Sequence, residues 1–237
     1  MAIIAGIKQW IADLSGILFP RLCEVCDKPL VHGEDFICLE CRVNMPLCDI
    51  HRDNFNSIHQ RLMRKVPIER AAAYFHYHRE SPYTNLIMSA KYRGRPIIIR
   101  KLGAEFARKI KPDGFFDGID AIIPVPMHPS KKHRRGYNQA EILAMGLHDQ
   151  TALPILSNLI ATRPHSTQTR KNAYRRWLNA QHTYKLNHPE QLTGLHILLV
   201  DDVITTGSTL MACCKAIHSA CPSAHISILT LAATQLQ

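Results

Sequence analysis

The chain has 237 residues, of which 46% are hydrophobic and 20% are charged. This composition is typical of a globular protein with one sizeable core and an appendage, and it excludes a disordered chain. The formal net charge of +10 favours anionic partners such as nucleotides, pyrophosphate or nucleic acid, and charge alone does not choose among them.

The first 19 residues have apolar side chains at helical spacing. These are Ile3, Ile4, Ile7, Trp10, Ile11, Leu14, Ile17 and Leu18. The opposite side carries Lys8, Gln9 and Asp13, and this polar face argues against a membrane span. A single Lys without a small-residue cleavage site argues against a secretory signal. We predict an amphipathic helix over residues 1–19 that packs on the next domain, which is favoured over membrane association.

Four cysteines follow with the spacing of a metal site. They read CxxC, eleven residues, CxxC, and are Cys23, Cys26, Cys38 and Cys41. Each pair can place two thiolates on one turn, and two such turns complete a closed, tetrahedral zinc site. A disulfide framework is the rival interpretation, but the chain has no export signal. We therefore predict a structural zinc module over residues 20–55.

The other cysteines need a separate interpretation. Cys48 and His51 repeat the two-residue gap as CxxH. They could be a third ligand pair, a replacement for one of the first two pairs, or the remnant of a second knuckle. Cys213, Cys214 and Cys221 lie in an apolar helical stretch and at its exit, where small buried cysteines are expected.

The middle of the chain alternates between strand and helix patterns. Residues 53–65 are polar without a clear period and indicate a connector. Alternating aromatic side chains at 71–78 predict a strand, and Ser81-Pro82 opens a helix that ends at Lys91 to Gly94. A cation at a helix end is common for dipole reasons alone, so Lys91 fits a structural role and a functional role equally. A second helix is expected from about 99 to 110.

A basic segment follows the next strand. Residues 119–125 are apolar and lead into PVPMHPSKKHRRGYNQ, where Lys131, Lys132, Arg134 and Arg135 gather around Gly136. A solvated run of charge is one interpretation. We favour a basic, mobile loop that closes over pyrophosphate, because a lid needs positive charge for the leaving group and a glycine hinge.

A helix at 140–149 and a strand at 156–160 are expected next. Beyond them the basic residues recur at helical spacing beside Trp177, so a phosphate-binding surface or an exposed helical face would fit. The polar residues of this segment are Arg163, Thr167, Gln168, Arg170, Lys171, Arg175, Arg176 and Asn179.

The stretch ILLVDDVITTGST, residues 197–209, is the most informative part of the chain. Residues 197–200 form an apolar run dense enough for a buried parallel strand, and the run is followed by Asp201 and Asp202. Ligands of α/β proteins collect outside the carboxyl ends of parallel strands. A helix over 210–218 and a strand over 225–231 complete an α/β fold with a parallel-sheet core.

The hydroxyl-rich loop of this stretch is suited to a phosphate group. It consists of Thr205, Thr206, Gly207, Ser208 and Thr209. Gly207 permits a tight turn, and consecutive amides at a helix start attract an anion. The two acids would repel phosphate, so they are better placed to hold hydroxyls or a metal. Together the loop and the acids indicate a ribose 5-phosphate, although a strand with a capped helix and a Ser/Thr-rich turn is the structural alternative.

These residues resemble the signature loop of type I phosphoribosyltransferases. The order of motifs along nearly the whole chain indicates a smaller group within this superfamily. The motifs are the N-terminal helix, the four-cysteine knuckle, KYRG, PVPMH with RRGYNQ, the segment with Gln168 and Asn179, and LLVDDVITTGST. In this order they resemble the bacterial ComF family, also called the GntX family. The resemblance implies a phosphoribosyltransferase-like domain over residues 66–237 and a link to natural transformation or DNA use. It also implies a cytoplasmic protein, single-stranded DNA as a partner and contact with competence proteins.

The resemblance also implies roles for individual residues. Asp201 and Asp202 would contact the ribose 2′ and 3′ hydroxyls of phosphoribosyl pyrophosphate (PRPP), and the TTGST loop would wrap its 5′-phosphate. From the residues themselves we expect Arg134 and Arg135 of the basic segment, with Lys91 as a weaker choice, to stabilise the departing pyrophosphate together with Mg²⁺. The family often has a further CxxC where this chain reads Cys48 to His51, which leaves the ligand set and the metal count open.

Three functions remain compatible with these residues. The protein could be a catalytic phosphoribosyltransferase of nucleotide metabolism with no connection to DNA uptake. It could bind PRPP or a nucleotide as a regulatory signal without turnover. It could also use the knuckle and a basic face to bind single-stranded DNA during transformation. Intact acids and an intact phosphate loop favour ligand binding, but they do not establish catalysis.

Overall fold

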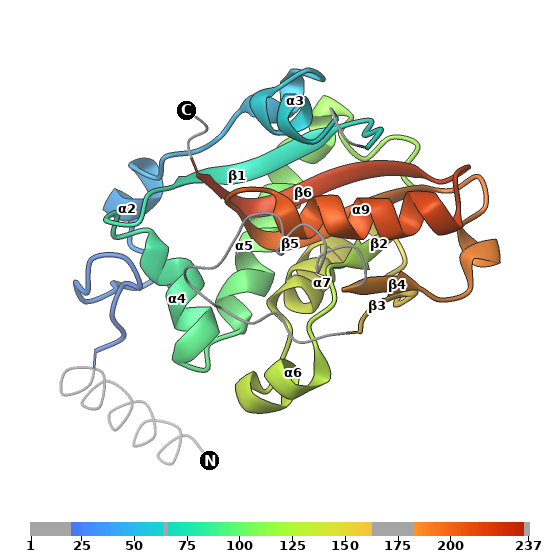
Figure 1. Cartoon of the computed structure of the whole chain (residues 1–237). Coiled ribbons are helices and arrows are strands. Elements are labelled where there is room, and N and C mark those ends of the chain that lie inside the picture. The colour runs from blue at the N-terminus through green and yellow to red at the C-terminus, as the bar shows by residue number, and fades with distance from the viewer. Residues whose placement is uncertain (1–19, 64–65, 163–182, 235–237) are drawn as a thin grey trace, which may run out of the picture.

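The computed structural model describes residues 20–63, 66–162 and 183–234 (Figure 1). The predicted helix at 1–19 and the basic segment at 163–179 lie outside the described residues. None of the helices in the described part of the chain is long and apolar enough to cross a membrane.

A four-stranded parallel sheet forms the centre of the molecule. Its strands lie in the order β1 (Ala71–Tyr77), β6 (His225–Thr234), β5 (His196–Ile204) and β2 (Ala121–Pro124). All three pairings are parallel. The prediction of an α/β fold with a parallel core is confirmed.

The two faces of the sheet are covered by different helices. α9 (Ser208–Ala220) crosses one face, whereas α5 (Ile97–Ile110) and α7 (Gln139–Thr151) lie behind the other (Figure 1). Side chains alternate along a strand, so Ile197 and Leu199 of β5 pack with α9 while Leu198 and Val200 pack with α5. Both faces are therefore buried, as the continuous apolar run of β5 requires.

A small second sheet lies beyond β2. It pairs β3 (Leu159–Ala161) with β4 (Tyr184–Leu186) in antiparallel fashion. Ile155 makes only an isolated bridge to Ile122 of β2. The strand expected at 156–160 is thus shifted towards 161, and it belongs to this second sheet instead of the core.

The N-terminal part contains more helix than expected. α2 (Leu39–Val43) and a 3-10 helix, η1 (Ile50–Arg52), precede α3 (Ser57–Met63). The prediction that residues 53–65 are only a connector is wrong, because Ile58 and Leu62 of α3 are fully buried against the α9 face.

The basic segment after β2 also differs from the prediction. It forms a helix, α6 (Pro129–Arg135), where a loop was expected. A proline opens this helix, and the ring of His128 accepts a hydrogen bond from the Ser130 N–H at 3.3 Å. The other helices of the described residues are α4 (Thr84–Tyr92) and the 3-10 turns η2 (Lys111–Asp113) and η3 (Pro189–Leu192).

Candidate functional site

The two adjacent acids lie inside β5 and not after it. The strand was expected to end at residue 200, but pairing with β6 continues from Asp201 to Ile204. Because successive side chains of a strand point to opposite faces, Asp201 and Asp202 are directed to different sides of the sheet. The two carboxylates therefore have separate surroundings and separate partners.

Asp202 is paired with a lysine from α4. Its Oδ2 lies 2.7 Å from Nζ of Lys91, and the two side chains are only 14% and 22% exposed. A half-buried ion pair at the end of a parallel strand is where a polar ligand of this fold would bind. The structure thus brings together two residues that the sequence separates by more than a hundred positions.

α6 brings Lys131 close to Asp202, and Arg135 close to Lys131. Burial, and after it the nearby cations Arg135 and Lys91, lower the pKa of Lys131, while Asp202 and Asp201 act in the opposite direction. Arg135 also bonds Gln139 and lies 5.6 Å from the centre of the Tyr92 ring.

The basic residues of α6 differ in exposure and in their neighbours. The structure therefore points to other candidates for the ligand site than the sequence does. Arg134, a predicted site residue beside Arg135, lies on an exposed part of the helix. Lys131 is not among the predicted site residues. The proline at position 129 is a helix-start signal, and a helix from there would have placed Lys131 and Arg135 on one face.

Asp201 faces the side of the sheet that α9 covers. Burial and the neighbouring Asp202 carboxylate raise the pKa of Asp201 to about 7. Its Oδ1 accepts a hydrogen bond from the Asp202 N–H at 2.9 Å. Burial raises the pKa of Cys213 on α9, with smaller contributions from Cys214 and Asp201, which agrees with this placement.

The hydroxyl-rich loop forms a small cradle between β5 and α9. A hollow of about 30 Å³ is lined by Asp201 and by residues 203–210. Gly207 has a φ of +73°, and α9 begins at the next residue. The first N–H groups of a helix have no intrahelical partner, so this start presents amides and partial positive charge to an anion. Thr206 and Ser208 add hydroxyls, whose oxygens lie 2.8 Å apart.

α3 packs against this cradle, a contact that the sequence analysis does not predict. Nη1 of Arg61 donates to the carbonyl oxygen of Thr205 at 2.6 Å. Leu62 packs beneath Gly207, where a Cβ would lie 2.8 Å from the Leu62 Cδ2. The only signal in the sequence was the pair of apolar residues at positions 58 and 62, a spacing of one helical turn.

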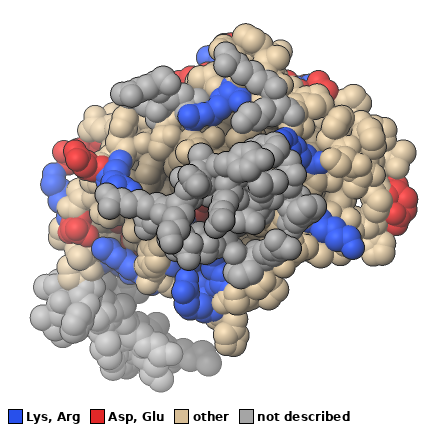
Figure 2. Space-filling view, viewed as in Figure 1, with Lys and Arg blue, Asp and Glu red and all other residues tan. Residues whose placement is uncertain are grey.

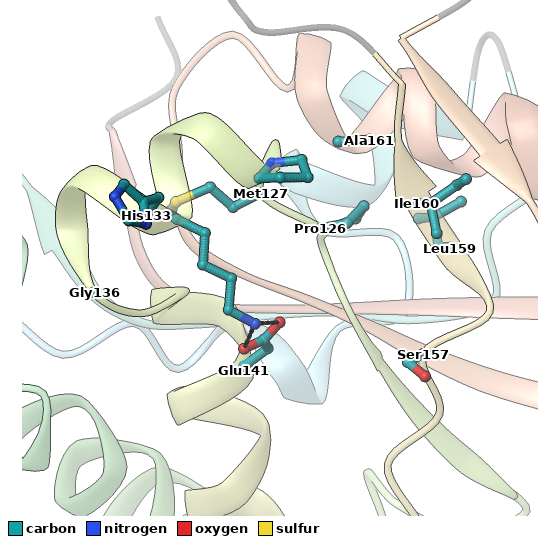
Figure 3. A pocket seen from close by; sticks show the side chains of 11 residues that line it. Pro126, Met127, His133, Gly136, Glu141, Ser157, Leu159, Ile160 and Ala161 are labelled. Carbon is teal, nitrogen blue, oxygen red and sulfur yellow. Dashed lines mark hydrogen bonds and ion pairs between the residues drawn. The ribbon is translucent and has the colours of Figure 1, made fainter.

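A larger pocket lies on the other side of α6. It has a volume of about 560 Å³, and α6, α7 and β3 contribute to its walls. In Figure 3, Met127 and His133 lie on the α6 side of the pocket, and Leu159 and Ile160 on the β3 side. Lys132 lines it as well and binds both oxygens of Glu141, at 2.8 and 2.7 Å. α6 thus places Lys131 near the acids and Lys132 at this pocket.

The four predicted cysteines form one cluster. The sulfur atoms of Cys23, Cys26, Cys38 and Cys41 all lie within 4.8 Å of one another. The Sγ atoms of Cys26 and Cys38 are 3.7 Å apart, which matches the edge of about 3.8 Å of a tetrahedron with Zn–S bonds of about 2.3 Å. A disulfide requires a separation of about 2.05 Å. The cluster is therefore compatible with a structural zinc module.

The cluster includes one thiol that ionises readily. Although burial opposes the charge, hydrogen bonds from the backbone N–H groups of Cys38, Cys26 and Val25 lower the pKa of Cys23 to about 7. Burial raises the pKa of Cys41. A metal ion needs thiolates, and backbone donors aimed at a sulfur are the usual way in which a knuckle stabilises them.

Cys48 and His51 do not join this cluster. Cys48 is buried near β1, where its N–H donates to the carbonyl of Tyr74 at 2.8 Å, and burial raises its pKa to about 12. Nε2 of His51 lies 2.8 Å from the carboxylate of Asp113. Each of the two residues therefore has a partner elsewhere in the fold, and neither lies with the four clustered cysteines.

The positively charged side chains of the described residues do not form one continuous patch on the viewed face (Figure 2). On the face viewed in Figure 2, Lys and Arg side chains lie in several separate groups, and Asp and Glu lie mostly towards the periphery. This distribution gives a generally positive surface without one continuous basic stripe among the residues drawn in colour.

Comparison with known proteins agrees with this geometry. The model of the phosphoribosyl transferase domain family matches residues 132–235. The chain is 29% identical to Competence protein ComFC of Bacillus subtilis over 144 residues, which are 60% of this chain and 55% of that one. It is 40% identical to Competence protein F of Haemophilus influenzae over 93 residues, or 38% and 41% of the two chains.

Among solved structures, the glutamine PRPP amidotransferase from B. subtilis complexed with ADP and GMP is similar with a TM-score of 0.38 and 18% identity. That likeness covers 60% of this chain and 30% of the amidotransferase chain. A longer match in sequence is to the DNA utilization protein YhgH of Escherichia coli O157:H7, which is 30% identical over 203 residues. Because this match covers 81% of the chain and 88% of the relative, the protein belongs to the ComF family, whose members have a phosphoribosyltransferase-like domain.

Proposed function

We propose that this protein binds PRPP with Mg²⁺ at the carboxyl end of β5 and acts in the uptake or use of DNA in the cytoplasm. The observation that carries the proposal is the half-buried Lys91–Asp202 pair, whose acid directly follows Asp201 of the cradle at the start of α9. A group of cations next to two acids and a helix start suits a ligand with phosphates at one end and hydroxyls at the other.

Each part of PRPP has a matching part in this arrangement. The 5′-phosphate would accept hydrogen bonds from the loop of Thr205, Thr206, Gly207, Ser208 and Thr209. The ribose hydroxyls would donate to Asp202 on the Lys91 side and, across the edge of the sheet, to Asp201, which lines the cradle. The pyrophosphate would lie near Lys91, Lys131 and Arg135, which provide three positive charges on the side of the sheet where Asp202 lies.

If the bound PRPP reacts, the reaction is transfer of the phosphoribosyl group to an acceptor. The bond between the anomeric carbon and pyrophosphate breaks, and charge develops on both fragments. Mg²⁺, when bound, would neutralise negative charge on the pyrophosphate. Lys91, Lys131 and Arg135 would stabilise the leaving group, and the acids would orient the ribose, so no protein nucleophile is required.

The cysteine cluster is proposed to hold zinc in a structural role. All four ligands come from the protein and leave no open position for a substrate. Its role is therefore in folding and in the support of the ligand site, and not in the chemistry itself.

A role with single-stranded DNA is supported by two observations. The net charge is +10, and the relatives are named for DNA utilization and competence. Single-stranded DNA binding usually combines cations with aromatic stacking, and Phe55 is an exposed aromatic side chain close to the cysteine module. Contacts with proteins of the competence machinery belong to the same proposal.

The proposal is tested by calorimetric titration of one preparation with PRPP, with and without Mg²⁺, and then with single-stranded DNA. We expect PRPP to bind in a Mg²⁺-dependent manner, and DNA affinity to fall steeply with salt. The Asp201→Asn, Asp202→Asn double variant should lose PRPP binding and keep its circular-dichroism spectrum. Affinity equal to that of the wild type in this variant would disprove the ribose assignment.

A further inference from the structure

α4 is held at both of its ends by the cysteine module. At its start, the hydroxyl of Tyr83 donates to the carbonyl oxygen of Cys41 at 2.8 Å. Beyond its end, Arg95 forms an ion pair with Glu24. Glu24 lies in the turn between Cys23 and Cys26, so both contacts join the segments that flank the helix to the cluster.

The contact with Glu24 differs from an ordinary surface ion pair because one partner is buried. The Glu24 side chain is 4% exposed. A buried carboxylate needs a partner, and removal of that partner leaves an uncompensated charge. Arg95 is that partner, and because its own side chain is 59% exposed it can be changed without opening the core.

α4 in turn carries Lys91 in its last turn, where Lys91 meets Asp202. The helix has nine residues and spans about 13 Å, which is short enough to move as one rigid rod. A further hydrogen bond joins the hydroxyl of Tyr137 to the carbonyl of Ala90, so the last turn is fixed from the α6–α7 side as well.

We propose that the cysteine module positions Lys91 for its contact with Asp202, and that Glu24, Arg95 and Tyr83 are the positioning residues. The module is then a part of the ligand site through α4. The consequence for PRPP binding rests on the proposed function, whereas the effect on the Lys91–Asp202 contact does not.

The contact itself can be measured without any ligand. Acetylation of Lys91 by a limiting amount of acetic anhydride, followed by mass spectrometry, reports how well Asp202 protects the ammonium group. We expect Arg95→Gln and Tyr83→Phe to increase the acetylation rate of Lys91 about fivefold and to leave the metal content unchanged. Arg95→Lys keeps the charge and should restore most of the protection.

Two controls separate positioning from a general loss of structure. Arg100→Gln breaks the ion pair of Arg100 with Asp149 between α5 and α7, where the distances are 2.8 and 2.9 Å, and should leave the acetylation rate of Lys91 unchanged. The rate at Lys132, which is held by Glu141 on the far side of α6, should not change in any of these variants.

PRPP affinity then tests the consequence in a double-mutant cycle. Arg95→Gln should weaken binding by about tenfold in the wild-type background and by less than about twofold in Lys91→Met, because the residue acts through Lys91. Equal losses in both backgrounds, or unchanged acetylation of Lys91, would overturn the inference. If the wild type does not bind PRPP, the proposed function fails, and the acetylation rates still decide the role of the module.

Discussion

Neighbouring lysines on α6 have opposite surroundings. Lys131 is partly buried and lies near Asp202, Lys91 and Arg135, whereas Lys132 is paired with Glu141 beside the larger pocket. Their charges and chain positions are nearly the same, so the two residues form a matched pair for testing where the anion binds.

We expect Lys131→Met to weaken PRPP binding by about tenfold or more, because it removes one of three cations around the proposed pyrophosphate position. Lys132→Met should change the affinity by less than about twofold, since its charge faces away from the acids. Calorimetry under identical salt conditions measures both values. Equal losses in the two variants would mean that only the total charge matters and that the assignment of the site is wrong.

The protonation of Asp201 makes stability depend on pH. Its folded pKa of about 7 lies above the value of about 3.9 for an unfolded chain, so the folded state binds the proton more tightly. The stabilisation is fully present below about pH 4, is lost as pH rises to about 7, and does not change further above that value.

We therefore expect the free energy of unfolding of the wild type to fall more steeply between about pH 4 and about pH 7 than that of Asp201→Asn. Urea denaturation at a series of pH values measures the difference, and all other groups contribute nearly equally to both proteins. If the two curves run parallel, the Asp201 carboxylate is not protonated in the folded protein at these pH values.

At the scale of elements, the central strands could be predicted because each contains either a short apolar run, as in β2 and β5, or an alternating pattern, as in β1 and β6. The end of β5 could not. The two acids looked like the end of the strand, but β6 is ten residues long and continues to pair beyond Asp201, through Val203 and Ile204. The extent of a strand depends on its neighbour, which a local pattern does not contain. This is why the acids were expected to act side by side and are found on opposite faces.

The short helices were missed for a related reason. α3 and α6 have seven residues each, and a helix of that length is marginal unless tertiary contacts stabilise it. α3 is held by the burial of Ile58 and Leu62, and α6 by the ion pair of Lys132 with Glu141. The partners of both helices lie on other elements, so only weak local signals, the proline at 129 and the apolar pair at 58 and 62, point to the helices that carry Lys131 and Arg61.

The junction between β5 and α9 depends on a glycine that meets both a backbone and a packing requirement. Gly207 and Gly194 have the same φ of +73°, but only Gly207 has a neighbour close to its missing Cβ, the Leu62 Cδ2 at 2.8 Å. Substitution by alanine costs about 1–2 kcal/mol for the left-handed backbone at either position, and it adds a clash with α3 at Gly207 alone.

We therefore expect Gly207→Ala to lower the free energy of unfolding by about 1 kcal/mol or more beyond the loss in Gly194→Ala. PRPP binding should be weakened only in Gly207→Ala, because its cradle shifts. Urea denaturation and calorimetry measure the two effects. Equal destabilisation by both substitutions would show that α3 yields freely and does not support the cradle.

At the scale of the whole molecule, the cysteine module is continuous with the sheet. Phe36 and Ile37 of the module belong to the same buried cluster as Phe75 of β1 and Phe106 of α5. Leu47 also forms a bridge with Phe75 at the edge of the sheet. The division into a module over 20–55 and a domain over 66–237 stays a prediction, and the shared core indicates that the two parts do not unfold independently.

This continuity determines what loss of the metal should do. We expect Cys38→Ser to lose the bound metal and to lower the melting temperature of the whole chain in a single transition, because a metal that binds only the folded state stabilises everything that unfolds with it. A chelator should lower the melting temperature of the wild type to that of this variant and leave the variant unchanged.

Cys48→Ser is the control. Cys48 is a buried cysteine outside the cluster, so this variant should keep its metal. Full metal content in Cys38→Ser together with a loss in Cys48→Ser would transfer the ligand role to Cys48 and His51, whereas two separate transitions on metal removal would mean that the module and the sheet fold as independent units.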